Sequence, residues 1–531
     1  MTATREEGTS MSTGVVTGES LDVLGGLVGG PRTDDVLRAA AVAAPDAVAL
    51  VSPAGTLTYA EFDLKVDALA AALRERVGQG AVIALTAALD ESFAVGYFAI
   101  ARSGNISALI NPLLRPDGYT HVLRTSGARL AIVVPSVYLR VAEVFDRLPE
   151  LGWLVLTHRV GEELPEAETV RELVTAATPS SDEPDAGPDD VACLQFTSGT
   201  TGAPKAVRLS HRNLTVNAAQ VAHSHRLDPY SVLVNYLPTF HLMHLTAGVA
   251  ARATHVLCPG DDPVVAIETA ARYRATHFYS LPVRLSRLAV DPRLSGLTVP
   301  TLRAILSGGS SLPGPATLSL SQQFGVPVVQ GYGLAETSPL TNSENLDRWK
   351  LGSSGPPVPG TSVRVVDVAT RAVLPVGGIG EIEVVGPQLM QGYLGRDLAT
   401  ELTADGWFAT GDIGRVDADG HLFVVDRIKD VFKCDNWLVS PSEIERVVLR
   451  HPGVADCVVV DYPDEFSGAV ACGVIVPRGA DFDPEDLRSF VAARTPYYEN
   501  LRHITLVDAI PRSPNGKVQR RAVRDSVLGT S

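Results

Sequence analysis

The sequence has few cysteines, and they form no pattern. Its 531 residues include five cysteines, and none of them stands in a CxxC spacing. Disulfide frameworks and zinc sites depend on paired or closely spaced cysteines, so neither is indicated. A reducing cytoplasmic location is therefore expected.

Long apolar runs and positive charge are also scarce. Charged residues interrupt every apolar stretch before ~18 residues, the length that a membrane span needs, so no span is predicted. The first residues carry Arg5 and Glu6 ahead of any apolar run, which does not match a signal peptide. The chain has 45 basic and 60 acidic residues, which gives a net charge of −15. Such a chain has no general attraction to nucleic acid, so a local basic or dipolar site must hold any anionic ligand.

What is present is an alternation of short apolar runs and helical patterns, which predicts an α/β fold. Thr58 and Glu61 form a capping box before a helix, and apolar runs such as Val82–Leu85 and Leu130–Val134 predict strands. We expect a flexible tail over 1–31, a large domain of helix-covered β-sheets over 32–428 with a β-rich subdomain near Val363–Val425, and a small mobile α+β domain over 429–531. A second capping box, Ser440 with Glu443, opens a helix of that small domain.

The strongest chemical motif is the ten-residue segment FTSGTTGAPK, from Phe196 to Lys205. A loop with two glycines and four hydroxyls can wrap a polyphosphate with inward backbone N–H groups, and Lys205 adds a positive charge. It is not a Walker A loop, because Pro204 precedes the lysine where that motif needs GK[ST]. The segment therefore predicts a nucleotide-phosphate site.

This motif resembles the phosphate loop of the adenylate-forming superfamily, which comprises acyl-CoA ligases, beetle luciferases and amino-acid-activating domains. The resemblance continues in order through further motifs over nearly the whole chain, and the chain is most similar to the acyl-CoA ligases. It implies ATP, Mg²⁺ and CoA as the small molecules used, and a carboxylic acid as the substrate. The oligomeric state does not follow from the sequence.

The segment Pro238-Thr239-Phe240-His241 matches the family motif that gates the acyl pocket. Amino-acid-activating domains carry an Asp here for the substrate amine, and this chain has none; a buried amine without a counterion is costly, so an α-amino acid is not expected. The resemblance implies an acyl pocket formed by His241, Met243, Ala247, Gly248 and Gly333, with room for a bulky apolar or aryl acid.

Two Gly-rich turns, Ser307–Ser310 and Gln330–Thr337, fit the purine and phosphates. Their glycines let backbone approach a flat base, Tyr332 can stack on it, and Glu336 is a hard oxygen ligand suited to Mg²⁺. The family pattern has Thr where this chain has Ala335. A missing hydroxyl donor costs roughly 1–3 kcal/mol, which predicts slower adenylation.

Later motifs complete the expected site. A carboxylate such as Asp412 suits two ribose hydroxyls and Arg427 can support them; by resemblance, Lys429 is the hinge and Lys517 bridges carboxylate and nucleotide. The catalytic set is then Lys517, His241, Lys205 and Lys433, and the CoA tunnel takes Cys434, Asn436 and Trp437. The nucleotide-binding set is Thr197, Ser198, Gly199, Thr200, Thr201, Gly202, Lys205, Gly309, Ser310, Gly331, Tyr332, Gly333, Thr337, Asp412 and Arg427, with Glu336 for the metal.

The predicted function is that of an acyl-CoA ligase, which forms an acyl-AMP from ATP and a carboxylic acid and passes the acyl group to CoA. Because of Ala335, a competing hypothesis is an enzyme that only forms thioesters from a supplied acyl-adenylate. The acceptor is CoA or an acyl carrier protein's phosphopantetheine. Two further hypotheses are a non-catalytic nucleotide- or acyl-binding homologue, which is disfavoured because binding alone does not need Lys517, and a P-loop ATPase, which is disfavoured by the missing GK[ST].

Overall fold

The computed structural model describes residues 14–27, 30–145, 147–148, 150–158, 167–178, 184–197, 204–435, 437–479, 481–512 and 518–529. The chain divides into two compact units. The larger comprises Val16–Val363 and Val384–Phe408, and the smaller comprises Arg364–Glu383, Ala409–Ser531 and the residues up to Val15. The hinge at Lys429 stays a prediction.

One sheet of the larger unit has seven strands, in the order β10-β9-β5-β4-β6-β7-β8. All neighbours are parallel except β9 and β10, which form an antiparallel hairpin. The predicted runs at Val82–Leu85 and Leu130–Val134 are β4 and β6. The strands are β4 (Val82–Thr86), β5 (Ile106–Ile110), β6 (Leu130–Val133), β7 (Trp153–Leu156), β8 (Glu168–Thr169), β9 (Val191–Phe196) and β10 (Ala206–Ser210).

Helices cover this sheet and the region next to it. In α2 (Tyr59–Val77) the predicted capping box is present: Thr58 accepts from the Glu61 backbone N–H, and Glu61 accepts from that of Thr58. The apolar face of α2, with Phe62, Val66 and Leu69, is buried as predicted. The other helices are α1 (Thr33–Ala43), α3 (Glu91–Arg102), α4 (Pro116–Ser126), α5 (Pro135–Phe145) and α6 (Val170–Ala176).

The second sheet of the larger unit has eight strands, in the order β16-β15-β14-β13-β11-β12-β2-β3. Its six central strands run parallel, and the hairpin partners β16 and β3 are antiparallel at the edges. The strands are β2 (Val48–Ser52), β3 (Gly55–Thr58), β11 (Val232–Tyr236), β12 (Thr254–Leu257), β13 (His277–Ser280), β14 (Ala304–Ser307), β15 (Val328–Gly333) and β16 (Leu340–Ser343).

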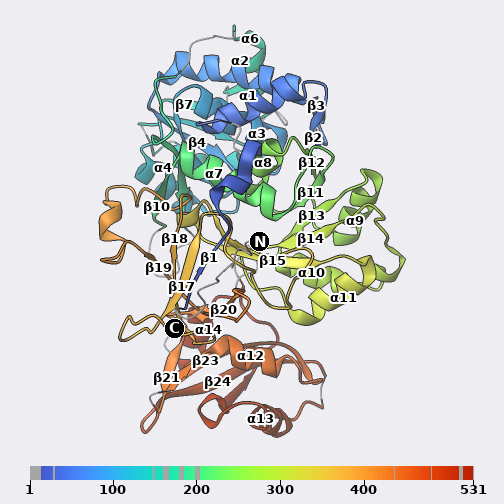
Figure 1. Cartoon of the computed structure of the whole chain (residues 1–531), viewed down its shortest axis with the longest axis vertical. Helices are drawn as coiled ribbons and strands as arrows, with labels where there is room; N and C mark the ends of the chain where they lie inside the picture. The colour runs from blue at the N-terminus through green and yellow to red at the C-terminus, as the bar shows by residue number, and fades with distance from the viewer. Residues whose placement is uncertain are drawn as a thin grey trace, which may run out of the picture. The chain divides into compact units, whose positions relative to one another are not determined.

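Both faces of this second sheet are buried, which explains its apolar strands. One face packs with α9 (Pro263–Arg272), α10 (Pro282–Ala289) and α11 (Gly314–Phe324), which lie together beside β13 and β14 (Figure 1). The other face packs with α7 (His211–Ser224) and α8 (Leu242–Ala250). Ligands of open parallel sheets bind at the carboxyl ends of the strands, so this edge is where a site is expected.

A third sheet accounts for the predicted β-rich stretch. It has the order β1-β17-β18-β19-β20, and the boundary between the two units runs through its strands. The strands are β1 (Val15–Thr17), β17 (Ser362–Val366), β18 (Gly380–Val385), β19 (Phe408–Val416) and β20 (Leu422–Arg427).

Part of the segment predicted as a flexible tail is ordered. β1 pairs with β17, and the 3₁₀ helix η1 (Leu21–Leu27) buries Leu24. Folded structure therefore begins within the segment 1–31 that the sequence assigns to a flexible tail. The composition of the segment did not reveal this, because its partner strand lies more than 300 residues later in the chain.

The C-terminal part of the smaller unit is an α+β fold, as predicted. Its sheet has the order β22-β21-β24-β23, with β25 on β24, and α12 and α13 lie along it (Figure 1). The elements are β21 (Phe432–Cys434), β22 (Trp437–Val439), α12 (Pro441–Val448), β23 (Val454–Asp464), β24 (Gly468–Pro477), α13 (Pro484–Ala492), β25 (Leu501–Leu506) and α14 (Arg520–Leu528). Ser440 caps α12 by accepting from the Glu443 backbone N–H, and Pro441 stands at the first helical position.

Candidate active site

The predicted phosphate loop connects β9 to β10. At its base the Thr197 N–H donates to the Lys205 carbonyl over 3.0 Å, and the Lys205 N–H donates to the Thr197 hydroxyl over 3.2 Å. These two bonds extend the β9–β10 ladder and clamp the loop at its ends. The loop residues Ser198, Gly199, Thr200, Thr201 and Gly202 lie outside the described residues.

Lys205 and Glu336 are linked through a buried tyrosine. The Lys205 Nζ lies 4.4 Å from the centre of the Tyr393 ring, and the Tyr393 hydroxyl donates to Glu336 Oε1 over 2.7 Å. Burial, and next the Glu336 charge, raise the pKa of Tyr393, so it remains a donor. The structure thus brings the predicted phosphate-binding lysine and the predicted metal carboxylate to opposite sides of one side chain.

Tyr393 is the residue that sequence reasoning missed. Its segment lies along β10: the Arg208 N–H donates to the Gly392 carbonyl, and the Leu394 N–H donates to the Ala206 carbonyl. The Met390 N–H also donates to the Glu336 carbonyl over 2.8 Å. Since Tyr393 stands 57 positions after Glu336, only the paired backbone of β10 shows that it belongs to the site.

The glycines of the Gln330–Thr337 turn are explained by backbone packing. A Cβ on Gly333 would lie 1.7 Å from the Pro339 carbonyl oxygen, and one on Gly331 would lie 2.8 Å from Leu340 Cδ1. Both positions pair with β16, so glycine is required for that close hairpin. Gly309, at φ +83°, has open space around it and, with Ser310, is exposed after β14.

Glu336 stands in a short 3₁₀ turn, η3 (Ala335–Thr337), directly after β15. Thr337 is buried, and its hydroxyl accepts from the Leu334 N–H over 3.0 Å and lies within hydrogen-bond distance of the Leu334 and Pro339 carbonyls. That hydroxyl therefore holds the turn together. Tyr332 stands on β15 opposite Asn342 and is half-buried.

His241 caps α8. Its Nδ1 accepts from the Met243 N–H over 3.4 Å, which leaves the proton on Nε2 in the neutral ring. Burial lowers the pKa of His241 to about 4, so the ring is neutral at pH 7. A neutral ring with its proton on Nε2 can donate a hydrogen bond to a carboxylate or phosphate oxygen.

The other predicted pocket residues differ in their surroundings. Met243 is half-buried and packs on the face of the second sheet, and Ala247 is fully buried in the same cluster. Gly248 faces His255: a Cβ there would lie 2.2 Å from His255 Nε2. Gly248 thus allows α8 to lie close on the sheet.

Four further histidines surround Tyr279 and α8. His225 Nδ1 and the Tyr279 hydroxyl are 3.0 Å apart, and His277 Nε2 lies 2.9 Å from the His225 carbonyl. The His244 ring lies 4.2 Å from the Tyr279 ring. Burial lowers the pKa of His225 to about 3 and that of His255 and His277 to about 4, so all three are neutral at pH 7.

In the smaller unit, the predicted ribose-binding pair is assembled. Asp412 on β19 stands opposite Arg427 on β20, with Arg427 Nε 3.4 Å from Asp412 Oδ1. The Asp412 N–H donates to the Thr410 hydroxyl, which itself donates to the Ile382 carbonyl. Asp412 is buried and Arg427 is half-buried, an arrangement that suits recognition of a diol by a carboxylate.

The predicted CoA-tunnel residues lie on the β21–β22 hairpin. Cys434 is buried and stands opposite Trp437, which is 54% exposed and stacks on Tyr498 at 5.2 Å. Lys433 and Lys429 are both exposed, and burial, followed by the nearby Arg427 charge, lowers the pKa of Lys429. Asn436 and Lys517 lie outside the described residues.

The residues at Glu336 fit a magnesium ion only if phosphate oxygens supply most of its ligands. Among the described residues no group of three or more His, Cys, Asp or Glu side chains could hold a metal by itself. Mg²⁺ needs only one or two carboxylates when phosphates supply other ligands, and Glu336 is buried beside the phosphate loop's lysine. A carboxylate has about four lone-pair sites, so the bond from Tyr393 leaves capacity for a cation.

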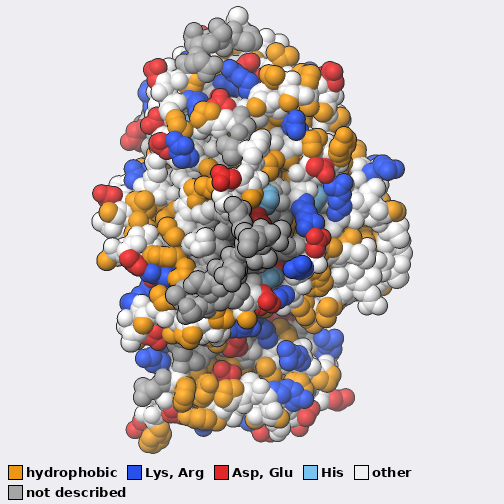
Figure 2. Space-filling model, viewed as in Figure 1, with side chains coloured by type: hydrophobic (Ala, Val, Ile, Leu, Met, Phe, Trp, Pro, Cys, Tyr) orange, Lys and Arg blue, Asp and Glu red, His pale blue; other side chains and the backbone are white. Residues whose placement is uncertain are grey.

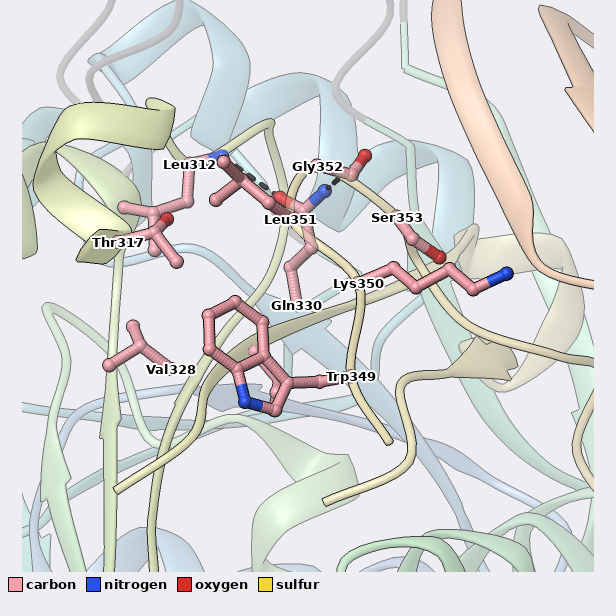
Figure 3. A pocket seen from close by; sticks show the side chains of 10 residues that line it. Leu312, Thr317, Val328, Gln330, Trp349, Lys350, Leu351, Gly352 and Ser353 are labelled. Atoms are coloured by element: carbon pink, nitrogen blue, oxygen red, sulfur yellow. Dashed lines mark hydrogen bonds between the residues drawn. The ribbon is translucent and has the colours of Figure 1, made fainter. Parts of the chain in front are cut away.

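A small pocket lies beside β15 and α11, and none of the predicted acyl-pocket residues lines it (Figure 3). Gln330 spans it, accepting from the Leu312 N–H over 2.9 Å and donating to the Gly352 carbonyl over 3.3 Å. Its volume is about 10 Å³, which is room for about one water molecule. It cannot hold an acyl group.

On the face drawn in Figure 2, basic and acidic side chains of the described residues are interspersed. They form no large patch of a single charge there. No helix in the described parts of the chain has the length and apolar character that crossing a membrane requires.

The chain is similar to known proteins along most of its length. Residues 37–394 match the model of the AMP-binding enzyme family, and residues 443–517 match that of the AMP-binding enzyme C-terminal domain. The chain is 33% identical over 511 residues to 4-coumarate–CoA ligase 2 of Oryza sativa subsp. japonica, covering 90% of each chain.

Two solved structures are similar in fold. ATP-bound MatB from Rhodopseudomonas palustris has a TM-score of 0.83 at 27% identity, over 91% of this chain and 96% of that one. The anthranilate–CoA ligase AuaEII in complex with anthranoyl-AMP has a TM-score of 0.86 at 23% identity, over 94% and 98%, a likeness of fold alone.

Proposed function

This chain belongs to the AMP-binding enzyme family and is an AMP-forming acid–thiol ligase, and we propose that it activates a bulky apolar or aryl carboxylic acid and transfers the acyl group to CoA. The observation that carries the proposal is the buried link from Lys205 through Tyr393 to Glu336. It supports the proposed roles of Lys205 as phosphate-binding cation and Glu336 as metal-binding carboxylate, because in-line displacement at a nucleotide phosphate requires groups held in fixed positions.

In the first half-reaction a substrate carboxylate attacks the α-phosphate of ATP, and pyrophosphate leaves. Lys205, at the end of the phosphate loop, offsets charge that develops on the phosphates. We assign the same role to Lys517, on the resemblance. When bound at Glu336, Mg²⁺ neutralises phosphate charge. His241, neutral with its proton on Nε2, is placed to donate to the carboxylate or to the acyl oxygen.

In the second half-reaction a thiol attacks the acyl-AMP, and AMP is the leaving group. We propose that the smaller domain turns at Lys429 and brings the β21–β22 hairpin, with Lys433, Cys434 and Trp437, to the thiol. CoA is our first choice of acceptor and an acyl carrier protein's phosphopantetheine the second. Asp412 and Arg427 are proposed to hold the ribose, in keeping with their pairing across β19 and β20.

The class of acid is supported by the pocket and by the relatives. Met243 and the Tyr279 ring belong to one apolar cluster on the α8 face of the second sheet. Curated relatives at about the 30% level of identity are 4-coumarate–CoA ligases, whose named substrate is an aryl acid. An aromatic ring and a flexible thioether in this cluster suit packing against an aryl group.

Acid-dependent exchange of pyrophosphate into ATP tests the proposal. A panel of aryl, fatty and bulky polycyclic acids should give exchange with one class, and a Lys517→Ala variant should lose it by a factor of about 10²–10³, the size expected for one charge-stabilising group. Arg521→Ala, an exposed position four residues later, is the matched control and should keep full exchange. No exchange with any acid, when a synthetic acyl-AMP still yields acyl-CoA, would contradict the first half-reaction.

That last outcome describes the second candidate function, an enzyme that only makes thioesters from a supplied acyl-adenylate. Ala335 favours it, because this position at the start of η3 lacks the hydroxyl that the family supplies there.

A further inference from the structure

We infer that His244 determines specificity: its imidazole hydrogen-bonds an uncharged polar substituent, such as a hydroxyl, on the aryl group of the acid. The inference rests on the proposed function and deepens it. It comes from the position of the ring, from one unpartnered nitrogen and from the groups that surround them.

The position of His244 is on the first turn of α8, directly after Met243. Its ring lies between two others, 5.5 Å from that of His241 and 4.2 Å from that of Tyr279. His241 is the predicted gate of the acyl pocket, and Met243 and Tyr279 belong to the apolar cluster on the same face of the sheet. The ring is therefore at the wall against which an acyl group is expected to lie.

The unpartnered atom is Nδ1 of His244. This atom is buried, and it has no hydrogen-bond partner among the described residues. Native structures rarely leave such an atom unpaired, because a buried polar group without a partner loses its bond to water and gains nothing in return. A substrate group that bonds Nδ1 would restore the lost bond.

Neighbouring histidines differ in this respect. His277 has partners at both ring nitrogens, the Thr276 hydroxyl at Nδ1 and the His225 carbonyl at Nε2. His225 Nδ1 is paired with the Tyr279 hydroxyl. His255 Nε2 is unpartnered, but it lies directly under Gly248, where α8 covers it. Of these rings, His244 is the one that combines an unpartnered buried nitrogen with a place beside His241.

The surroundings restrict the substituent to an uncharged one. The pKa of His244 lies well below its ordinary value. Burial is the main cause, and the neighbouring His241, His225 and His255 lower the pKa further. A neutral ring can donate or accept a hydrogen bond but offers no charge to a second carboxylate. An anionic substituent would be buried without a counterion at this ring, so a hydroxyl is preferred over a carboxylate.

The experiment measures AMP release for matched acids: benzoic and cinnamic acid, their meta- and para-hydroxy derivatives, and the corresponding dicarboxylic acids. We expect one hydroxy position to raise kcat/KM about tenfold over the parent acid in the native chain. His244→Leu should remove that preference and leave the parent acid's kcat/KM within about threefold.

Two polar variants keep the inference testable if the leucine variant does not fold. In His244→Asn the amide occupies the place of Nδ1, so the hydroxyl preference should survive in part, whereas the longer His244→Gln should lose it. Thr246→Val, on the same helix, is the matched control, since its hydroxyl bonds the Leu242 carbonyl of its own helix. It should keep the native preference.

The outcomes separate this inference from the proposed function. AMP release with equal kcat/KM for parent and hydroxylated acids, or a hydroxyl preference that persists in His244→Leu, would overturn the role of His244 and leave the ligase intact. Absence of AMP release with every acid would instead overturn the function on which the inference rests.

Discussion

At the scale of single residues, the site depends on one aromatic side chain that touches two charged ones. The Tyr393 ring faces the Lys205 ammonium, and its hydroxyl donates to Glu336. A hydrogen bond to a charged group contributes about 1.5–3 kcal/mol, and a cation over an aromatic face contributes about 0.5–2 kcal/mol. Both contacts fix the positions of Lys205 and Glu336, and the rate of a positioned reaction depends on such placement.

Tyr393→Phe separates these contacts, because it keeps the ring under Lys205 and removes the donor to Glu336. We expect the Mg²⁺ concentration for half-maximal pyrophosphate exchange to rise about three- to tenfold. Calorimetric titration of the variant with Mg²⁺–ATP should show weaker binding as well. Tyr462→Phe, in the smaller unit, is a control tyrosine, and equal Mg²⁺ dependence of native chain and Tyr393→Phe would contradict the positioning role.

Ala335→Thr tests whether the missing hydroxyl limits adenylation. Because a donor to a phosphate oxygen is worth roughly 1–3 kcal/mol, we expect exchange to increase by about five- to a hundredfold. Ala335→Val, of similar shape without the hydroxyl, should give no increase. An unchanged rate in the threonine variant would show that the departure at Ala335 does not limit the first half-reaction.

At the scale of elements, functional side chains stand at the ends of strands and on tight hairpins. Glu336 follows β15, His241 precedes α8, and Lys205 directly precedes β10. In the smaller unit Trp437 on β22 is exposed and stacks on Tyr498, and its partner Cys434 on β21 is buried. The exposed indole of Trp437 offers an aromatic face on which a ligand such as the predicted thiol substrate can stack.

Trp437→Ala should therefore affect the thiol step alone. We expect the KM for CoA in acyl-CoA formation to rise about tenfold, since stacking on an aromatic ring is worth roughly 1–3 kcal/mol. Pyrophosphate exchange should remain at the native rate. Phe466→Ala, another exposed aromatic residue of the smaller unit, serves as control, and a loss of exchange in Trp437→Ala would show that the hairpin acts in adenylation too.

At the scale of the whole molecule, the buried neutral histidines couple stability to pH. His211, His225, His241, His255 and His277 all have pKa values lowered by burial to about 3 or 4. In the unfolded chain they titrate near 6.5, so below that pH the unfolded state binds protons that the folded state does not. The stability that these neutral histidines contribute to the folded state is fully present above pH 6.5. It is lost as the pH falls toward 4, because protonation then favours the unfolded chain.

We therefore expect the free energy of unfolding of the larger unit to fall between pH 6.5 and 4, by up to about 1.4 kcal/mol per pH unit for each such histidine. Trp153, Trp349 and Trp407 lie in that unit, so denaturant unfolding followed by fluorescence reports it. In His255→Gln the free energy of unfolding should fall less steeply between pH 6.5 and 4, because the contribution of one histidine is removed. Equal unfolding free energies at pH 7 and pH 5 would contradict this account.

The class of fold and the order of motifs were determined by the sequence alone. Local signals suffice for them: the capping box at Thr58, the apolar runs of β4 and β6 and the glycine-rich loop each depend on residues close together in the chain. The glycine-rich loop predicted Lys205, and the resemblance of the later motifs to the family predicted Glu336 and the pair of Asp412 and Arg427.

Only the tertiary structure decided which side chains meet. Tyr393 joins Lys205 and Glu336 because its distant segment pairs with β10 through an isolated bridge, and β1 is ordered because β17 pairs with it. His244 acquires its unpartnered nitrogen from the packing of α8 against Tyr279. Long-range pairing and packing depend on the whole set of neighbours, whereas periodicity and capping depend on a few adjacent residues. That difference in range explains why the sequence predicted the elements and the motifs but not the contacts between them.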